Sequence, residues 1–252
     1  MEDREWLTQF FNDIMLCENG IYTLWGSSKP ITMIQVDTYS DAERKSFCAS
    51  ISEEEKKKCL IIYNYNLHKT WEKWEQISNR FPIKRYMLFK KDLDGDQNTF
   101  FVVFVDILKT ATMIQDNYEA FRRAVGFDFH SLEVVLEMTQ KDSIFWRKIE
   151  HHAHLSGLLY GFGNKNSYLF QWKYFDHPKS CDDFCDKIKF LSSNELTKGH
   201  IKYTIDNFGL PSFASFNEID DVIDRYKEER IKIKEIYKEN DFLDLTLKKL
   251  TS

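Results

Sequence analysis

Glu150, His151 and His154 have the side chains and the spacing to bind a metal ion or to transfer protons. Residues three and four positions apart share one face of a helix, so these groups would converge. The His-Glu-x-x-His pattern of zinc proteases is absent, and no further ligand set accompanies them. We therefore interpret these histidines, with His152, as surface or helix-packing residues, and predict no metal site.

A second group with ligand chemistry is His177, Cys181 and Cys185, at spacings of four residues. Zinc sites usually contain paired Cys-x-x-Cys or Cys-x-x-His units, and only one irregular half is present here. Pro178 also disfavours a helix through His177. A zinc-stabilised module remains an alternative hypothesis.

Carboxylates alternate in Asp92-Leu93-Asp94-Gly95-Asp96, as they do in calcium loops. A calcium loop needs Gly at its sixth position and Glu at its twelfth, where this chain has Gln97 and Val103. Apolar runs flank the segment, so it predicts a hairpin turn.

Two glycine-containing segments combine turn residues with polar side chains. The first, residues 22–30, includes Gly26, Lys29 and Pro30; the second, residues 157–166, ends at Asn166. The glycines at 157, 161 and 163 permit close packing or positive φ. We interpret both segments as architectural joints, and keep as the alternative that the amides and free N–H groups of Asn164-Lys165-Asn166 bind an anion or carbonyl.

No complete catalytic motif accompanies these groups. Gly-x-Ser-x-Gly, Gly-x-Gly-x-x-Gly and Walker motifs are all absent. An enzyme would have to use dispersed groups that meet in one pocket, and the candidates are Lys29, Glu150, His154 and Asn166. No cofactor is predicted.

The elements that must position these groups follow from hydrophobic periodicity. Residues 4–16 predict an amphipathic helix, and the apolar runs 21–25 and 31–36 predict a hairpin. Residues 41–50 and 52–79 are helical in pattern, although 60–65 could equally form a buried strand. The clearest hairpin joins residues 86–91 to 99–106.

The rest of the chain is predicted to be mainly helical. Residues 107–174 have helical periodicity with breaks near Gly126 and Gly161, and a long amphipathic helix with an apolar seam covers residues 219–238. The fold class is therefore α+β. We predict a core domain over residues 1–174, and a mixed connecting region with a C-terminal helix over 175–252.

Composition limits the functions available. A net charge of -5 argues against nucleic acid binding, and 15% aromatic residues argue against disorder. The most apolar run, residues 100–108, contains Asp106 and is too short to span a membrane. Five scattered cysteines and the absence of a signal peptide predict a soluble cytoplasmic protein with reduced thiols.

The two glycine-containing segments resemble an uncharacterised family from chlamydia-type obligate intracellular bacteria. That family has a Tyr-Thr-Leu-Phe-Gly-x-Lys-Pro segment and a Gly-x-Leu-Leu-Gly-Tyr-Gly-x-x-Asn segment, which correspond here to residues 22–30 and 157–166. Trp25 replaces the Phe, one extra residue precedes Lys29, and Phe162 replaces the Tyr. The resemblance implies a bacterial protein that meets host components, and it implies no activity.

The leading hypothesis is a non-enzymatic binding or interaction protein. An incomplete catalytic set and a long amphipathic helix suited to docking favour it. Its expected partner is a protein, and one option is a homodimer through the C-terminal helix. Delivery to a host cell without a Sec signal is a separate expectation. The alternatives are an enzyme acting on a small polar substrate and the zinc-stabilised module.

Overall fold

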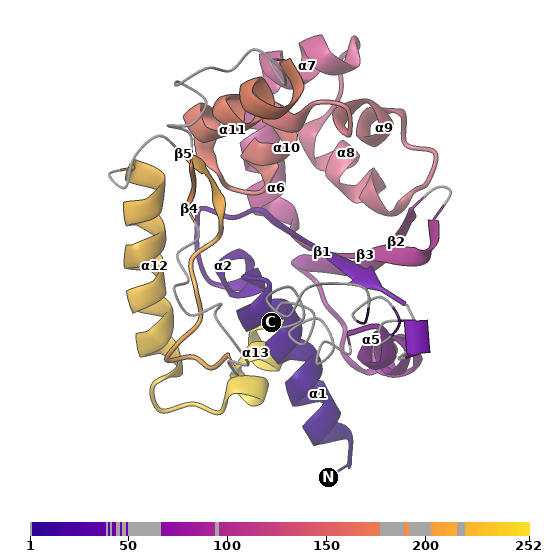
Figure 1. Cartoon of the computed structure of the whole chain (residues 1–252), viewed down its shortest axis with the longest axis vertical. Coiled ribbons are helices and arrows are strands. Elements are labelled where there is room, and N and C mark those ends of the chain that lie inside the picture. The colour runs from indigo at the N-terminus through magenta and orange to yellow at the C-terminus, as the bar shows by residue number, and fades with distance from the viewer. Residues whose placement is uncertain are drawn as a thin grey trace.

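The sheet at the centre of the molecule has three antiparallel strands in the order β1-β3-β2. The computed structural model describes residues 2–38, 67–93, 96–176, 189–191, 203–215 and 220–252, with isolated positions between 40 and 49. Helices lie on both sides of the sheet (Figure 1). The predicted α+β class is confirmed.

The strands β2 (Tyr86–Leu93) and β3 (Asp96–Asp106) form the predicted hairpin, with an irregularity at Asp92 and Leu93. Its strands extend into the segment predicted as a turn, of which residues 94 and 95 lie outside the described residues. β1 (Ile31–Asp37) pairs with the other edge of β3, so that Met33 and Phe89 lie opposite Val103 from its two sides.

The predicted hairpin of residues 21–25 with 31–36 is wrong. Residues 20–24 form the helix α2 (Gly20–Leu24), which follows Asn19 in the left-handed conformation at φ 62°. All five of its residues are buried, so neither a two-residue nor a helical period is visible in the sequence. Tertiary packing overrides the strand propensity of Ile21, Tyr22 and Thr23.

One face of the sheet packs against both ends of the chain. Ile34, Val102 and Phe104 point into a core shared with α1 (Glu2–Asn12), the π-helical segment Asp13–Cys17, and α5 (Leu67–Ile77). The first helix is as predicted, and α5 confirms the described part of the helix predicted over 52–79. Residues 51–66 lie outside the described residues.

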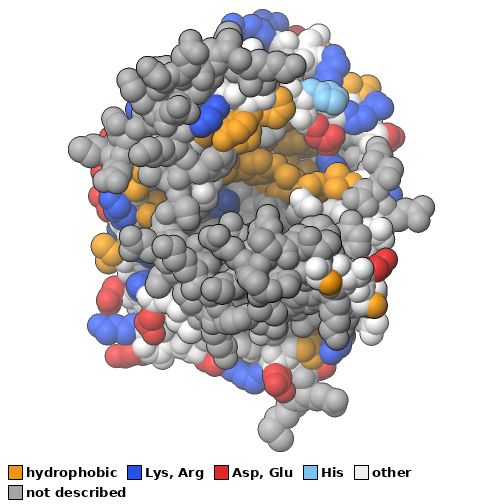
Figure 2. All heavy atoms as spheres, viewed as in Figure 1, with side chains coloured by type: hydrophobic (Ala, Val, Ile, Leu, Met, Phe, Trp, Pro, Cys, Tyr) orange, Lys and Arg blue, Asp and Glu red, His pale blue; other side chains and the backbone are white. Residues whose placement is uncertain are grey.

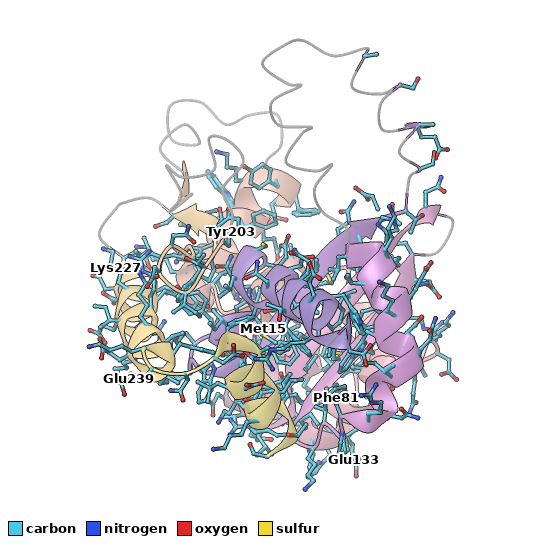
Figure 3. The ribbon with its side chains drawn as sticks, turned by 90° about the horizontal axis from the view of Figure 1, so that it is seen from below. Met15, Phe81, Glu133, Tyr203, Lys227 and Glu239 are labelled. Atoms are coloured by element: carbon cyan, nitrogen blue, oxygen red, sulfur yellow. The ribbon has the colours of Figure 1, made fainter. Side chains whose placement is uncertain are left out.

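The C-terminal segment completes this core with α12 (Asp221–Tyr237) and α13 (Phe242–Thr251). α13 lies beside α1, whose Arg4 binds Asp244 at 2.7 Å, whereas Lys227 and Glu239 lie at the outer edge (Figure 3). The boundary predicted at residue 174 stays a prediction, but residues on both sides of it share one core. The small sheet of β4 (Lys189–Leu191) with β5 (Phe213–Ser215) belongs to the intervening region.

The apolar seam of α12 packs inside the chain itself, where Val222, Tyr226 and Ile233 are buried. A homodimer through this helix stays a prediction, and it would have to use the charged outer side, where Ile231 is exposed. Among the described residues, no helix is both long enough and apolar enough to span a bilayer.

The opposite face of the sheet packs against the helical part of the chain. Val103, Val105 and Ile31 contribute to this second core. The predicted helical run and its breaks are confirmed by α6 (Ile107–Asp116), α7 (Tyr118–Val125), α8 (Ser131–Leu136), α9 (Ile144–Ile149), α10 (Ala153–Leu159) and α11 (Gly163–Gln171). Short 3-10 (Glu137–Thr139) and π (Trp172–Asp176) segments follow α8 and α11.

Candidate functional site

The two glycine-containing segments of the sequence meet in space. Gly161, in the elbow between α10 and α11, has φ +80°, and a Cβ there would lie 2.3 Å from the Ser28 carbonyl oxygen and 2.9 Å from the Lys29 Cα. It would also lie 2.3 Å from the Tyr226 hydroxyl, which donates to the Gly161 carbonyl at 3.0 Å. We call this contact between loop 26–30, elbow 160–163 and α12 the joint.

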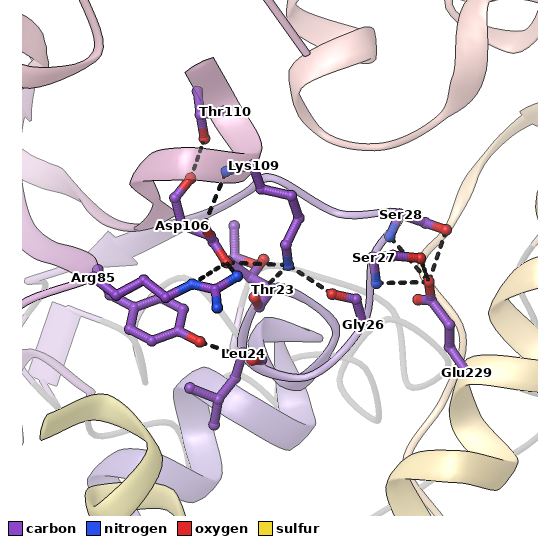
Figure 4. Close-up of polar contacts among 12 residues, drawn as sticks. Thr23, Leu24, Gly26, Ser27, Ser28, Arg85, Asp106, Lys109, Thr110 and Glu229 are labelled. Carbon is purple, nitrogen blue, oxygen red and sulfur yellow. Dashed lines mark hydrogen bonds and ion pairs between the residues drawn. The ribbon is translucent and has the colours of Figure 1, made fainter. Parts of the chain in front are cut away.

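Glu229 of α12 holds the loop side of the joint (Figure 4). Its Oε1 accepts hydrogen bonds from the backbone N–H and the hydroxyl of Ser27, both at 2.8 Å, and from those of Ser28, at 3.0 and 2.9 Å. Gly26 allows this approach, because a Cβ there would lie 2.3 Å from Glu229 Oε2. A buried carboxylate with four donors is a positioning group.

Lys109 holds the same loop from the sheet side. Its Nζ donates to the carbonyls of Thr23 and Gly26, each at 2.7 Å, and lies 3.5 Å from Asp106 Oδ2 (Figure 4). Arg85 binds the same carboxylate oxygen at 2.8 Å. Burial lowers the pKa of Lys109 to about 8, against the opposing effect of Asp106. This amine therefore caps the end of α2 and is committed to the backbone.

Lys29 is buried in the joint, where only 7% of its surface is exposed. Burial lowers the pKa of its amine to about 8, and the charge of Glu18 opposes that shift. The next residue, Pro30, accepts the backbone N–H of Asp106 at 3.0 Å, which fixes the start of β1. The contacts of this segment are those of an architectural joint.

Asn166 is buried on the other side of the elbow, where its Nδ2 donates to Asp220 Oδ1 at 3.3 Å. Asp220 caps α12 through the Val222 N–H at 2.9 Å and accepts from the Ser215 hydroxyl at 3.0 Å. Gly163, at φ +74°, lets Val222 approach, because a Cβ there would lie 2.7 Å from Val222 Cγ2. Asn166 thus ties α11 to the start of α12.

His154 belongs to α10, and its side chain packs against α11. Its Nε2 is 2.8 Å from Asn164 Oδ1, and its ring stacks on Tyr168 with centroids 3.5 Å apart. Burial lowers the pKa of the imidazole, although the hydrogen bond to Asn164 opposes the shift. Gly157 brings the two helices close, since a Cβ there would lie 2.5 Å from the Ser167 hydroxyl.

Glu150 is the C-cap residue of α9 and forms an ion pair with Lys91 of β2. Within the described residues, no hydrogen bond or ion pair joins any two of Lys29, Glu150, His154 and Asn166. No group of three His, Cys, Asp or Glu side chains among them could hold a metal ion. His177, Cys181 and Cys185 lie outside the described residues.

Glu150 does line a cleft of about 500 Å³ between the sheet and α9 and α10. The helices of the second core cover the Ile31 and Val105 end of the sheet, and the same face continues beyond them. There Met33, which is 40% exposed, lies with Phe89 and Phe101 on the floor of the cleft. Figure 2 shows hydrophobic side chains gathered in a hollow on this side of the molecule.

The walls of the cleft come from the helical part. Apolar surface comes from Trp146 and Ile149 of α9, from Leu159 at the end of α10 and from Tyr160 directly after it. The Tyr160 hydroxyl donates to Met33 Sδ at 3.4 Å, and burial raises its pKa to about 12. This hydroxyl is therefore neutral, and it joins the wall of the cleft to its floor.

A comparison with models of protein families, with curated proteins and with solved structures finds no match to this chain. The roles of its residues therefore rest on their geometry. The resemblance of residues 22–30 and 157–166 to a chlamydial family stays a prediction.

The sequence interpretation missed both Glu229 and the cleft. Glu229 follows Tyr226 by three residues and precedes Ile233 by four, so it occupies the apolar stripe of α12. A charged residue within an apolar stripe was the sequence signal that could have identified it. The cleft had no local signal, because its described lining comes from all three strands of the sheet, from α9 and α10 and from the segment before α9, which are dispersed along the chain.

Proposed function

We propose that the protein is a non-enzymatic binding protein that takes a small organic ligand with a mainly apolar body into the cleft. The observation that carries this proposal is the apolar floor, with Met33 exposed and Phe89 and Phe101 partly buried, beneath a cleft of about 500 Å³. Ligand sites in proteins are typically concave, mostly apolar, and roughly 300–1,000 Å³ in volume.

The chemistry of the other candidate residues favours binding over turnover. Lys29, His154 and Asn166 lie outside the described cleft lining. The hydrogen bonds of the His154 and Asn166 side chains join helices. A catalytic group must reach the substrate. Glu150 alone among the four lines the cleft, where it is paired with Lys91.

The test uses a neutral fluorescent probe, N-phenyl-1-naphthylamine, and two matched variants. Met33→Lys places a charge on the cleft floor. The control, Leu136→Lys, places the same charge at an exposed apolar residue that is not part of the described lining. We expect saturable binding at one site, weakened about tenfold or more by Met33→Lys and unchanged by Leu136→Lys. Absence of saturable binding, or equal loss in both variants, would overturn the proposal.

A further inference from the structure

Charge is distributed unevenly around the cleft. Its described lining contains four cations, Lys90, Lys91, Lys141 and Arg147, against the two acids Asp92 and Glu150. The chain as a whole has a net charge of -5. A cationic border on an anionic protein favours an anionic ligand over a cationic one.

The acids of the cleft are already neutralised. Glu150 pairs with Lys91, and Asp92 pairs with Lys90 at 3.2 Å and with Lys141 at 3.3 Å. Each acid thus has a partner, and Asp92 is shared by two lysines. The surplus positive charge of the border is not cancelled by the described side chains.

Arg147 carries part of that surplus. Its guanidinium forms no ion pair or hydrogen bond within the described residues. Ser143, Arg147 and Glu150 are spaced four and three residues apart, with Arg147 inside α9 and the other two at its caps, and all three line the cleft. A guanidinium binds carboxylates through two parallel N–H donors, which gives both affinity and orientation.

We propose that the ligand is an amphiphilic carboxylic acid, with its carboxylate at Arg147 and its apolar body over Met33, Phe89 and Phe101. This inference rests on the proposed function and adds the class of ligand. The two parts of such a molecule would contact different elements: the apolar body would lie on the sheet, and the carboxylate would bind the guanidinium of α9. Lys141, with its side chain 88% exposed, adds a second cation at the border.

The experiment measures binding of three probes with the same ten-carbon chain by isothermal titration calorimetry: decanoate, decan-1-ol and decyltrimethylammonium. We expect decanoate to bind about tenfold to a hundredfold more tightly than the alcohol, and the ammonium to bind most weakly. Arg147→Gln should remove the preference for decanoate and leave binding of the alcohol unchanged. Arg123→Gln, which removes the same charge from α7 outside the described lining, should preserve the preference.

The outcomes separate the two proposals. If alcohol and acid bind equally, the class of ligand is wrong while the cleft remains a binding site. If Arg147→Gln leaves the preference for decanoate intact, the placement of the carboxylate at Arg147 is wrong. If Arg123→Gln removes the preference as fully as Arg147→Gln does, general charge explains it and the assignment to Arg147 fails. If none of the probes binds and the neutral naphthylamine probe does not bind either, the proposed function itself fails.

Discussion

Gly161 and Gly126 form a matched pair for testing the joint. Both have φ +80°, so alanine at either position incurs the cost of a left-handed residue, about 1–2 kcal/mol. Around Gly126, the nearest atom to a new Cβ is the flexible end of Lys148, at 3.7 Å. Gly126→Ala should therefore destabilise the protein by that conformational cost alone.

Gly161→Ala adds steric overlap to the same conformational cost. Its Cβ would lie 2.3 Å from the Ser28 carbonyl oxygen and 2.9 Å from the Lys29 Cα, and neither backbone atom can rotate away. Moving the loop costs about 1–3 kcal/mol as overpacking. It also endangers the buried hydrogen bond from the Tyr226 hydroxyl, worth a further 1 kcal/mol or so. The expected total is about 3–6 kcal/mol.

Urea unfolding of both variants at one pH, followed by tryptophan fluorescence, measures the difference. We expect Gly161→Ala to lose about 2–4 kcal/mol more free energy of unfolding than Gly126→Ala. If the two losses agree within about 0.5 kcal/mol, the contact between loop and elbow is not tight, and the joint is wrongly assigned.

Three further predictions concern buried charges. Burial raises the pKa of Asp13 from its ordinary 3.8 to about 7, so the folded state binds more protons and loses roughly 2–3 kcal/mol of stability between pH 5 and 8. Asp13→Asn should abolish that loss in urea titrations at the two pH values, and an unchanged pH slope would contradict it. Glu229→Gln should cost about 1–3 kcal/mol because it weakens four charge-assisted hydrogen bonds, while Glu228→Gln on the exposed side should stay within about 0.5 kcal/mol by thermal melting. Asp106→Asn keeps the helix cap but leaves Arg85 without its ion pair, and a loss of about 1–3 kcal/mol is expected in the same melting assay; an unchanged melting temperature would show that the pair contributes nothing.

The sequence predicts those elements whose two sides differ. The first helix and α12 each have a buried and an exposed side, so their periodicity is visible. The hairpin of β2 with β3, whose second strand is buried on both faces, was predicted from the polar turn between its two apolar runs. α2 is buried on all sides, and its β-branched and aromatic residues suggested a strand. The pairing of β1 with β3 joins residues about 70 positions apart in the chain, and no local pattern encodes it.

The candidate site was predictable only in part, for a similar reason. Turn residues identified both halves of the joint: Gly161 and Gly163, which have positive φ, mark the elbow, and Gly26 and Pro30 mark the loop. Glu150 was chosen for its neighbouring histidines, but its described partner is Lys91 on the sheet. A cleft formed by the incomplete cover of a sheet follows from helix positions, which a sequence does not specify locally.

The joint and the cleft are directly connected in the structure, because the loop and the elbow that form the joint are continuous with the floor and the wall of the cleft. Loop 26–30 continues directly into Ile31 and Met33 of the cleft floor, and elbow 160–163 follows directly after Leu159 of its wall. The contact between Gly161 and Ser28 therefore fixes how far the end of α10 stands from the start of β1. The Tyr160 hydroxyl on Met33 Sδ spans the same separation from inside the cleft. Glu229 and Lys109 thus hold, through their polar groups, the loop that leads into the cleft floor, and neither residue belongs to the described cleft lining.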